Sequence, residues 1–152
     1  MVTSWRVVNR RFEEAAFDGE GARIAGGRWN SVGNPVVYTA ATTSLGLLEL
    51  LVHSSKTRLL PFYLVIPAIF DERRVEKVDR AQFPKDWRSY PLPRGTQEIG
   101  DQWLASGRSC ILEVPSVIVP HESNFMLNPN HPDFSSLEIG DAIDLDIDQR
   151  FV

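Results

Sequence analysis

The sequence predicts a single domain of the α/β class, of the α+β type, and three observations lead to that prediction. Apolar runs with the pattern of β-strands alternate along the chain with segments that have the pattern of helices. The chain has 152 residues, 43% of them hydrophobic, and a globular domain of this length buries about 70% of its unfolded surface. It contains no internal repeat, low-complexity tract or linker. We therefore expect one domain over residues 1–152.

The predicted strands are short apolar or alternating runs. The second opens with Pro35, at a position where a missing N–H is tolerated. The third, LLPFYLVI, has the apolar pattern of a buried strand. The expected strands cover residues 4–8, 35–40, 59–66, 109–116, the start of 123–134, and 143–148.

The last predicted strand, IDLDID, alternates strictly between aliphatic residues and aspartates. Such alternation predicts a half-buried strand. Three aspartates on one face could suggest a metal site, but the solvated face of an edge strand, protected against aggregation, is the favoured interpretation.

Two helices are expected, over residues 43–54 and 95–105. The first follows Thr42 or Thr43, either of which suits an N-cap. Its sequence SLGLLELLVHS is apolar almost all round, which predicts a buried helix. Three other segments are a mixed helix-or-loop region, a polar and charged region, and a proline-rich loop: 11–25, 71–79 and 84–95.

Charge and composition exclude several classes of function. The net charge is −4 and no basic run exceeds two residues, so capture of nucleic acid phosphates is not expected. No stretch has the pattern of a membrane span or a signal peptide, and we expect a cytoplasmic protein. The single cysteine, Cys110, lies in an apolar run and is expected to be a buried, inert thiol rather than a nucleophile.

Neither a metal site nor a resident cofactor is expected. The three histidines and the cysteine are scattered without the spacing of zinc ligands. The segment GEGARIAGG, residues 19–27, contains a Gly-x-Gly but leads on to a turn and a strand. A dinucleotide-binding fingerprint would instead follow a strand and open a helix.

Glu49 is the residue of the first helix that most needs an explanation. It lies among leucines, and glutamate is rarely buried without a partner or a cavity to face. One interpretation is a structural ion pair with His53 or an arginine. The other is a carboxylate that lines a cleft and stabilises developing positive charge.

Arg28 lies in GGRWNSVGNPVVYTA, where it follows two glycines and precedes a turn and a strand. It could cap backbone carbonyls near the turn, or it could hold a guanidinium where an anion such as a phosphate can approach closely. Tyr38, on the same face of the strand as Val36, would be a core residue in most strands. Further along, the run from 114 to 134 is dense in polar residues, which turn chemistry alone can explain: Ser116, Asn124, Asn128, His131 and Asp133.

These segments, in this order, resemble the RES-domain family, the toxin half of bacterial Xre–RES type II toxin–antitoxin pairs. The matching segments are GGRWNSVGNPVVYTA with Arg28 and Tyr38, LLELLVH with Glu49, EVPS with Ser116, and ESNFMLNPNHPDF. The resemblance extends from SWRVV near residue 5 to Phe134, and the combination of segments is specific where no single one is.

The resemblance implies an ADP-ribosyltransferase-like fold with mixed sheets around a central NAD-binding cleft, and NAD⁺ as the substrate rather than a bound cofactor. Arg28 would grip NAD⁺ through its phosphates or the adjoining ribose, and Tyr38 would pack on the nicotinamide ring. Glu49 would stabilise the charge that develops when the N-glycosidic bond breaks. Ser116 would contact the substrate or fix Glu49, and Asn124 is a weaker candidate for the same wall.

The resemblance leaves the acceptor of the ADP-ribosyl group open. Water would make the protein an NAD⁺ glycohydrolase, phosphate a phosphorylase, and a protein side chain an ADP-ribosyltransferase. A non-catalytic regulatory domain that only binds a nucleotide is the alternative of a different class. The resemblance also implies a cognate Xre-type antitoxin that obstructs the active site, and it is compatible with a homodimer within that complex.

Overall fold

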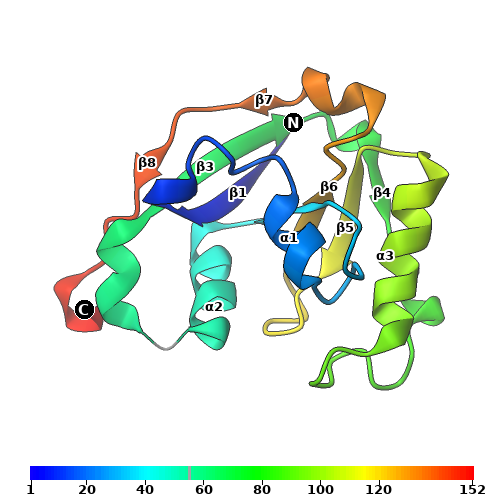
Figure 1. Ribbon diagram of the computed structural model, residues 1–152, viewed down its shortest axis with the longest axis horizontal. Helices are drawn as coiled ribbons and strands as arrows, with labels where there is room; N and C mark the ends of the chain where they lie inside the picture. Colours follow the sequence, from blue (N-terminus) through cyan, green and yellow to red (C-terminus); the bar gives the residue numbers. More distant parts are fainter. Residues whose placement is uncertain (55) are drawn as a thin grey trace.

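In the computed structural model, which describes residues 1–54 and 56–152, one eight-stranded sheet forms the centre of the molecule (Figure 1). Its strand order is β4-β5-β6-β2-β1-β3-β7, and β8 also pairs with β3. Among the strands of the described residues, β4 and β5 alone pair in parallel. The strands are β1 Val2–Asn9, β2 Val37–Ala40, β3 Tyr63–Phe70, β4 Val75–Lys77, β5 Ile111–Pro115, β6 Ser123–Leu127, β7 Glu138–Ile139 and β8 Ile143–Asp144. The α-helices are α1 Glu20–Ala25, α2 Thr43–His53 and α3 Arg94–Ser106. The predicted mixed α/β fold is confirmed.

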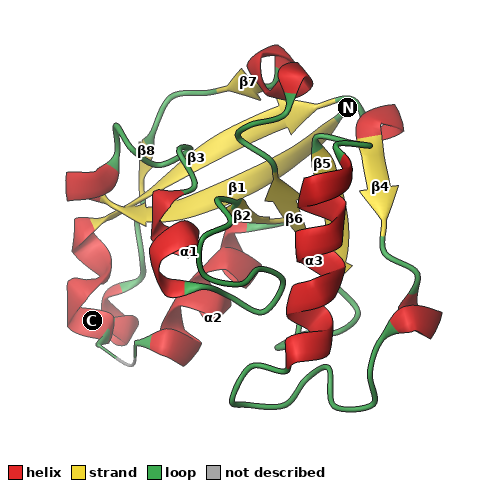
Figure 2. Ribbon diagram, turned by 45° about the vertical axis from the view of Figure 1, so that its right-hand side comes forward, coloured by secondary structure: helices red, strands yellow, loops and turns green. Residues whose placement is uncertain are grey.

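The two faces of the sheet are covered by different parts of the chain (Figure 2). Helix α2 packs closely on one face, because a Cβ on Gly46 would lie 2.7 Å from Val7 Cγ2 and 3.6 Å from Ala40 Cβ. Ala40 pairs with Asn124 in the β2–β6 ladder, so Asn124 projects from that face too. Helix α3 covers the same face further along through Trp103, which packs with buried residues of β5 and β6. The other face holds a second core cluster, which the segment around β7 helps to cover.

Most elements lie where the sequence predicts them. The helix expected at 43–54 is α2, and its N-cap is Thr42, whose Oγ1 accepts a hydrogen bond from Leu45 N at 3.0 Å. The helix expected at 95–105 is α3. The mixed region 11–25 contains the end of a 3-10 turn and the short helix α1.

Two predicted strands were wrong or incomplete, and two observed strands were not predicted. Residues 57–62 form a 3-10 helix that includes Pro61, so the strand expected at 59–66 begins only at Tyr63. The strand expected at 143–148 is limited to β8, over 143–144. The short strands β4 and β7 were not predicted. Each has three residues or fewer, and so short a segment becomes a strand through the partner beside it rather than through its own pattern.

The prediction that the leucine-rich helix is buried all round was also wrong. In α2 only Leu45 and Gly46 are buried, while Leu48 is 43% and Val52 is 64% exposed. The helix packs on the sheet along one side, and its apolar outer side faces solvent in the part of the chain that the structure describes. None of the helices in that part is both long and apolar enough to span a bilayer.

Candidate functional site

Three elements bring polar side chains together around Glu49. Ser116, directly after β5, donates a hydrogen bond from its Oγ to Glu49 Oε1 at 2.8 Å. Asn124 of β6 donates from Nδ2 to the same oxygen at 2.7 Å. The other carboxylate oxygen, Oε2, accepts no hydrogen bond from the described residues and is open to solvent. One oxygen of the carboxylate is therefore fixed, and the other is available to a ligand.

The Ser116 hydroxyl can point its proton only at Glu49. Its oxygen accepts hydrogen bonds from the backbone N–H groups of Ile118 and Val119, both at 3.1 Å. Those two contacts occupy the lone pairs, and the single proton remains for the carboxylate. Ser116 is fully buried, so this arrangement is shielded from competing water.

Asn124 contributes an acceptor that has no partner among the described residues. A carboxylate oxygen can only accept, so the contact with Glu49 fixes which way the Asn124 amide points. Its Oδ1 then lies buried without a hydrogen bond from the described residues. Leaving such an acceptor unsatisfied costs about 1–3 kcal/mol, so a water or a ligand that donates to Asn124 Oδ1 would be stabilised there.

Glu49 forms no ion pair with the residues that the structure describes. In the described part of the chain, no Lys, Arg or His nitrogen forms a salt bridge with it. The structural ion pair with His53 or an arginine, one of the two interpretations of the sequence, is therefore not observed.

The turn that carries Arg28 lies tightly between helix α3 and Tyr38. A Cβ on Gly100 of α3 would lie 1.6 Å from the Trp29 carbonyl oxygen. A Cβ on Gly27 would lie 2.8 Å from the Tyr38 hydroxyl. Glycine is thus required at both positions, because any side chain would push the turn away from its neighbours.

Arg28 contacts backbone carbonyls with one nitrogen of its guanidinium. Nη1 donates to the carbonyl of Trp87 at 2.9 Å and to that of Ser89 at 2.8 Å, so the capping role that the sequence left open is realised in part. Burial lowers the pKa of Arg28, and the negative charge of Glu49 opposes that shift, as would a Tyr38 phenolate at very high pH. Tyr38 lies beside the Arg28 turn, because its hydroxyl accepts from Trp29 N. Tyr38 also shares the α2 face of the sheet with Asn124, which binds Glu49.

Tyr38 is tied to the same turn by its hydroxyl. The hydroxyl accepts a hydrogen bond from Trp29 N at 3.1 Å and donates to Asn30 Oδ1 at 2.6 Å. Burial raises the pKa of Tyr38 well above its ordinary value, so the phenol stays neutral at physiological pH. Its ring projects from the α2 face of the sheet, because Tyr38 and Ala40 are two residues apart on β2.

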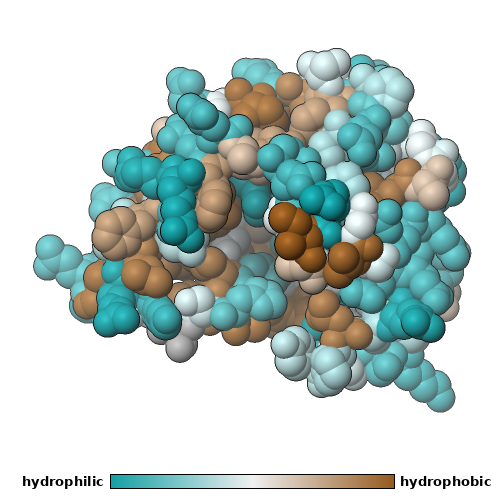
Figure 3. Space-filling view, in the orientation of Figure 1, coloured by the Kyte–Doolittle hydropathy of each residue, from teal (hydrophilic) through white to brown (hydrophobic). Residues whose placement is uncertain are grey.

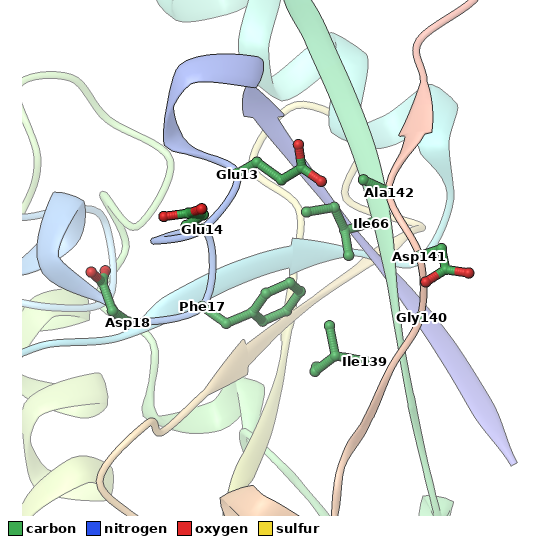
Figure 4. Close-up of a pocket in the computed structure, with 9 residues that line it drawn as sticks. All are labelled: Glu13, Glu14, Phe17, Asp18, Ile66, Ile139, Gly140, Asp141 and Ala142. Atoms are coloured by element: carbon green, nitrogen blue, oxygen red, sulfur yellow. The ribbon is translucent and has the colours of Figure 1, made fainter.

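A hollow of about 740 Å³ is lined by a different set of residues (Figure 4). Ile66 in its wall is paired with Arg6, the neighbour of Val7, and therefore faces the side of the sheet opposite α2. None of the sequence-predicted site residues lines it. Its walls combine apolar and acidic side chains from Glu13, Glu14, Phe17, Asp18, Ile66, Ile139, Gly140, Asp141 and Ala142.

Sequence reasoning missed the residues that hold the candidate site in place. Asn30 is buried and bonds Tyr38, and Asp101 of α3 accepts hydrogen bonds from the N–H and the hydroxyl of Ser31. Asn and Asp near a turn look like ordinary turn residues, so only their long-range partners distinguish them. Among residues 1–54 and 56–152, no three His, Cys, Asp or Glu side chains gather closely enough to hold a metal ion.

Known proteins resemble this chain over nearly its whole length. The family model of the RES domain matches residues 3–148. A protein of Photorhabdus laumondii named "Toxin Res" is 37% identical over 150 residues, covering 97% of this chain and 96% of that protein. A Sphingobium protein named "Prs ADP-ribosylating toxin" is 40% identical over 144 residues, covering 91% and 89% of the two chains. The fold is similar to a chain in the M. tuberculosis MbcT–MbcA toxin–antitoxin complex, with a TM-score of 0.74, 17% identity, and 95% and 84% of the two chains covered.

Proposed function

Because the chain belongs to the RES domain family, we propose that it is the toxin of a bacterial type II toxin–antitoxin system and cleaves the bond between nicotinamide and ribose in NAD⁺. The observation that carries this proposal is the Glu49 carboxylate, with Oε1 held by Ser116 and Asn124 and Oε2 open. The names of the related toxins support the same function.

The proposed reaction breaks the bond between the nicotinamide nitrogen and ribose C1′. The bonding electron pair leaves with the nicotinamide ring and neutralises its positive charge, while the ribose becomes oxocarbenium-like. Glu49 Oε2 stabilises that developing charge, and the acceptor then forms the new bond to C1′ and loses its proton.

Catalysis in this proposal depends on a carboxylate that is already in place. Hydrogen bonds of 2.8 and 2.7 Å to Oε1 stop the Glu49 side chain from rotating as the charge develops. A preorganised charge of this kind lowers the barrier without reorganisation at the moment of reaction. Arg28 binds a phosphate of NAD⁺ and Tyr38 packs on the nicotinamide ring, which leaves C1′ near Glu49.

The acceptor divides the proposal into two candidate activities. Water or inorganic phosphate gives a glycohydrolase or a phosphorylase, the function we propose first. Transfer to a protein side chain is the second, and the Sphingobium relative named as an ADP-ribosylating toxin favours it.

Nicotinamide release from NAD⁺ tests the proposal directly. We expect the purified protein to release nicotinamide, and mass spectrometry identifies the other product: ADP-ribose in plain buffer, a phosphorylated ADP-ribose in phosphate buffer, or a labelled protein in a cell extract. A well-folded protein that binds NAD⁺ but releases no nicotinamide in any of the three would be a nucleotide-binding regulatory domain, and the enzymatic proposal would be wrong.

We also propose an Xre-type antitoxin that restrains the toxin in the cytoplasm by covering the site. The similar fold in the MbcT–MbcA complex supports an antitoxin partner. Apolar side chains are exposed beside the site, with Val52 of α2 64% exposed and Ile24 of α1 65% exposed (Figure 3 shows apolar atoms at the surface over α1). NAD⁺ turnover should fall to background in the saturated complex, and full turnover there would refute the proposed obstruction.

A further inference from the structure

The segment 84–93, here called the strap, contacts both sides of the candidate site: Arg28 on one side and the turn after Ser116 on the other. It is the loop at the lower end of α3 in Figure 2. On one side Arg28 Nη1 binds the carbonyls of Trp87 and Ser89, at 2.9 and 2.8 Å. On the other side Arg88 Nε donates to the carbonyl of Val117 at 2.9 Å. Val117 directly follows Ser116, the residue that binds Glu49.

Aromatic packing fixes the start of the strap next to Arg28. The ring of Trp87 lies 5.2 Å from that of Phe83, and Phe83 lies 5.2 Å from Trp29. Trp29 is the chain neighbour of Arg28. Tilted aromatic rings at this spacing are mutually stabilising, so the strap and the Arg28 turn form one packed unit.

The contact made by Arg88, in the middle of the strap, leads to Glu49 through a compact turn. Arg88 holds Val117, and the next two residues, Ile118 and Val119, donate their N–H groups to Ser116 Oγ. Ser116 Oγ donates in turn to Glu49 Oε1. A shift of Val117 therefore moves the hydroxyl that holds the carboxylate.

The strap also decides which edge of the Arg28 guanidinium is available. Nη1 is occupied by the two carbonyls, while Nε and Nη2 have no hydrogen-bond partner among the described residues. A guanidinium is planar and rigid, so fixing Nη1 fixes the direction of the Nε–Nη2 edge. Two parallel N–H groups on that edge suit a phosphate.

We infer that the strap sets the distance and angle between Arg28 and the Glu49–Ser116 pair, and that Arg88 is a positioning residue for the bound dinucleotide. This inference rests on the proposed function, because it assumes that NAD⁺ spans the two walls. Arg88 acts through Val117 on one side and through the strap and Arg28 on the other. Its loss should loosen substrate binding first, since Glu49 keeps its contact with Asn124.

The first test needs no substrate. Hydrogen–deuterium exchange of residues 84–93 is measured in the wild type, in Arg88→Gln and in Arg80→Gln. Arg80 is the matched control, because its Nη2 donates to the carbonyl of Pro120 at 2.9 Å in the same turn but lies outside the strap. We expect exchange in the strap to be faster in Arg88→Gln alone. Equal exchange in all three proteins, or an equal rise in both variants, would overturn the inference.

The second test separates binding from turnover. For Arg88→Gln we expect KM for NAD⁺ to rise about tenfold with kcat within about threefold, because the substrate's two ends are held at a less exact separation. Arg80→Gln should match the wild type. Arg88→Lys can still donate to Val117 and should recover most of the loss. A fall in kcat with unchanged KM, or no difference between the Arg88 and Arg80 variants, would contradict a positioning role.

The two proposals fail in different ways. A wild type that releases no nicotinamide contradicts the proposed function, whereas the exchange experiment still reports whether Arg88 orders the strap. Conversely, an active wild type with an unaffected Arg88→Gln variant contradicts the positioning role alone. Arg88 and Arg80 are both exposed, and equal melting temperatures of the variants and the wild type confirm that loss of folding is not the cause.

Discussion

Glu49 and Arg28 are both charged residues that ordinary packing does not explain, but the protein holds them in different ways. Glu49 is fixed by two side chains from the sheet, Ser116 and Asn124. Arg28 is fixed by the backbone carbonyls of a loop. When the loop moves, Glu49 keeps its contact with Asn124 within the sheet, while the guanidinium moves with the strap. We therefore expect some mutations to slow cleavage of NAD⁺ and others to weaken its binding.

The largest expected effect is that of Glu49→Gln. Its Oε1 can still accept from Ser116 and Asn124, and only the negative charge is lost. Removing one preorganised electrostatic group typically costs about 10²–10³ in rate, and NAD⁺ binding should change far less, because the ground state carries less positive charge at the ribose. Nicotinamide release and calorimetric NAD⁺ binding measure the two effects.

The melting temperature of Glu49→Gln should hold or rise, since a partly buried charge is neutralised. A well-folded variant that consumes NAD⁺ at the wild-type rate would end the assignment of Glu49. A variant that loses activity only in proportion to its unfolding would make Glu49 structural.

Ser116→Ala should have the next largest effect. It removes one donor from Glu49 Oε1 and leaves the N–H groups of Ile118 and Val119 without their acceptor. We expect kcat to fall about tenfold, because the carboxylate is less well fixed, and stability to fall by about 1–3 kcal/mol. Turnover and urea unfolding measure these changes.

Ser123→Ala is the matched control for that variant. Ser123 donates to Glu113 Oε1 at 2.7 Å, but as the neighbour of Asn124 it faces the other side of the sheet. Its kcat should equal that of the wild type. Equal losses of kcat in both variants would show that loss of either serine–glutamate contact lowers turnover. That result would contradict a specific role of Ser116 in holding Glu49.

Arg28→Lys tests the role of Arg28 in binding NAD⁺. Lysine keeps the charge but lacks the planar fork, so it cannot hold the strap and a phosphate at once. We expect NAD⁺ to bind about tenfold more weakly, equivalent to about 1.4 kcal/mol, with a smaller change in kcat. Arg23→Lys, on the exposed side of α1 where Arg23 pairs with Glu20, is the control. Wild-type affinity in Arg28→Lys would mean that Arg28 only holds the strap.

The smallest expected effect is the alkylation of Cys110. Its rate also reports whether each of the variants above is folded. Burial raises the pKa of its thiol to about 11, so at neutral pH the group is protonated as well as inaccessible. Alkylation by iodoacetamide at pH 7.5 should proceed only as fast as the protein unfolds. Labelling of the native protein at the rate of a free thiol would contradict the predicted burial.

The raised pKa of Cys110 also makes the stability of the protein depend on pH. Because the folded pKa lies above the ordinary value of 9.0, the contribution of Cys110 to stability is complete below about pH 9. It declines as the pH rises toward 11, where the unfolded state releases the proton more readily. Urea midpoints of Cys110→Ala and the wild type, compared between pH 7 and pH 10, measure that decline.

The sequence by itself determined the elements whose signal is local. The helix α2 could be placed because Thr42 caps it and a long apolar run follows, and α3 because a proline-rich loop precedes it and Gly107 ends it. Arg28 and Glu49 could be singled out because each is costly where it lies: a guanidinium beside two glycines, and a carboxylate among leucines. Ser116 and Asn124 drew attention only through the family resemblance, since a serine and an asparagine in a polar run are ordinary turn residues.

Only the tertiary structure decided what those residues contact. Ser116 and Asn124 reach Glu49 across 67 and 75 residues of sequence, because β5, β6 and β2 lie side by side in the sheet and α2 packs on β1 and β2 beside them. The same long-range packing leaves Leu48 and Val52 exposed where the apolar pattern predicted burial, and it brings the strap against Arg28. Hydrophobic periodicity and capping are properties of neighbours in the chain, whereas strand order, helix docking and loop contacts depend on which surfaces exclude water together.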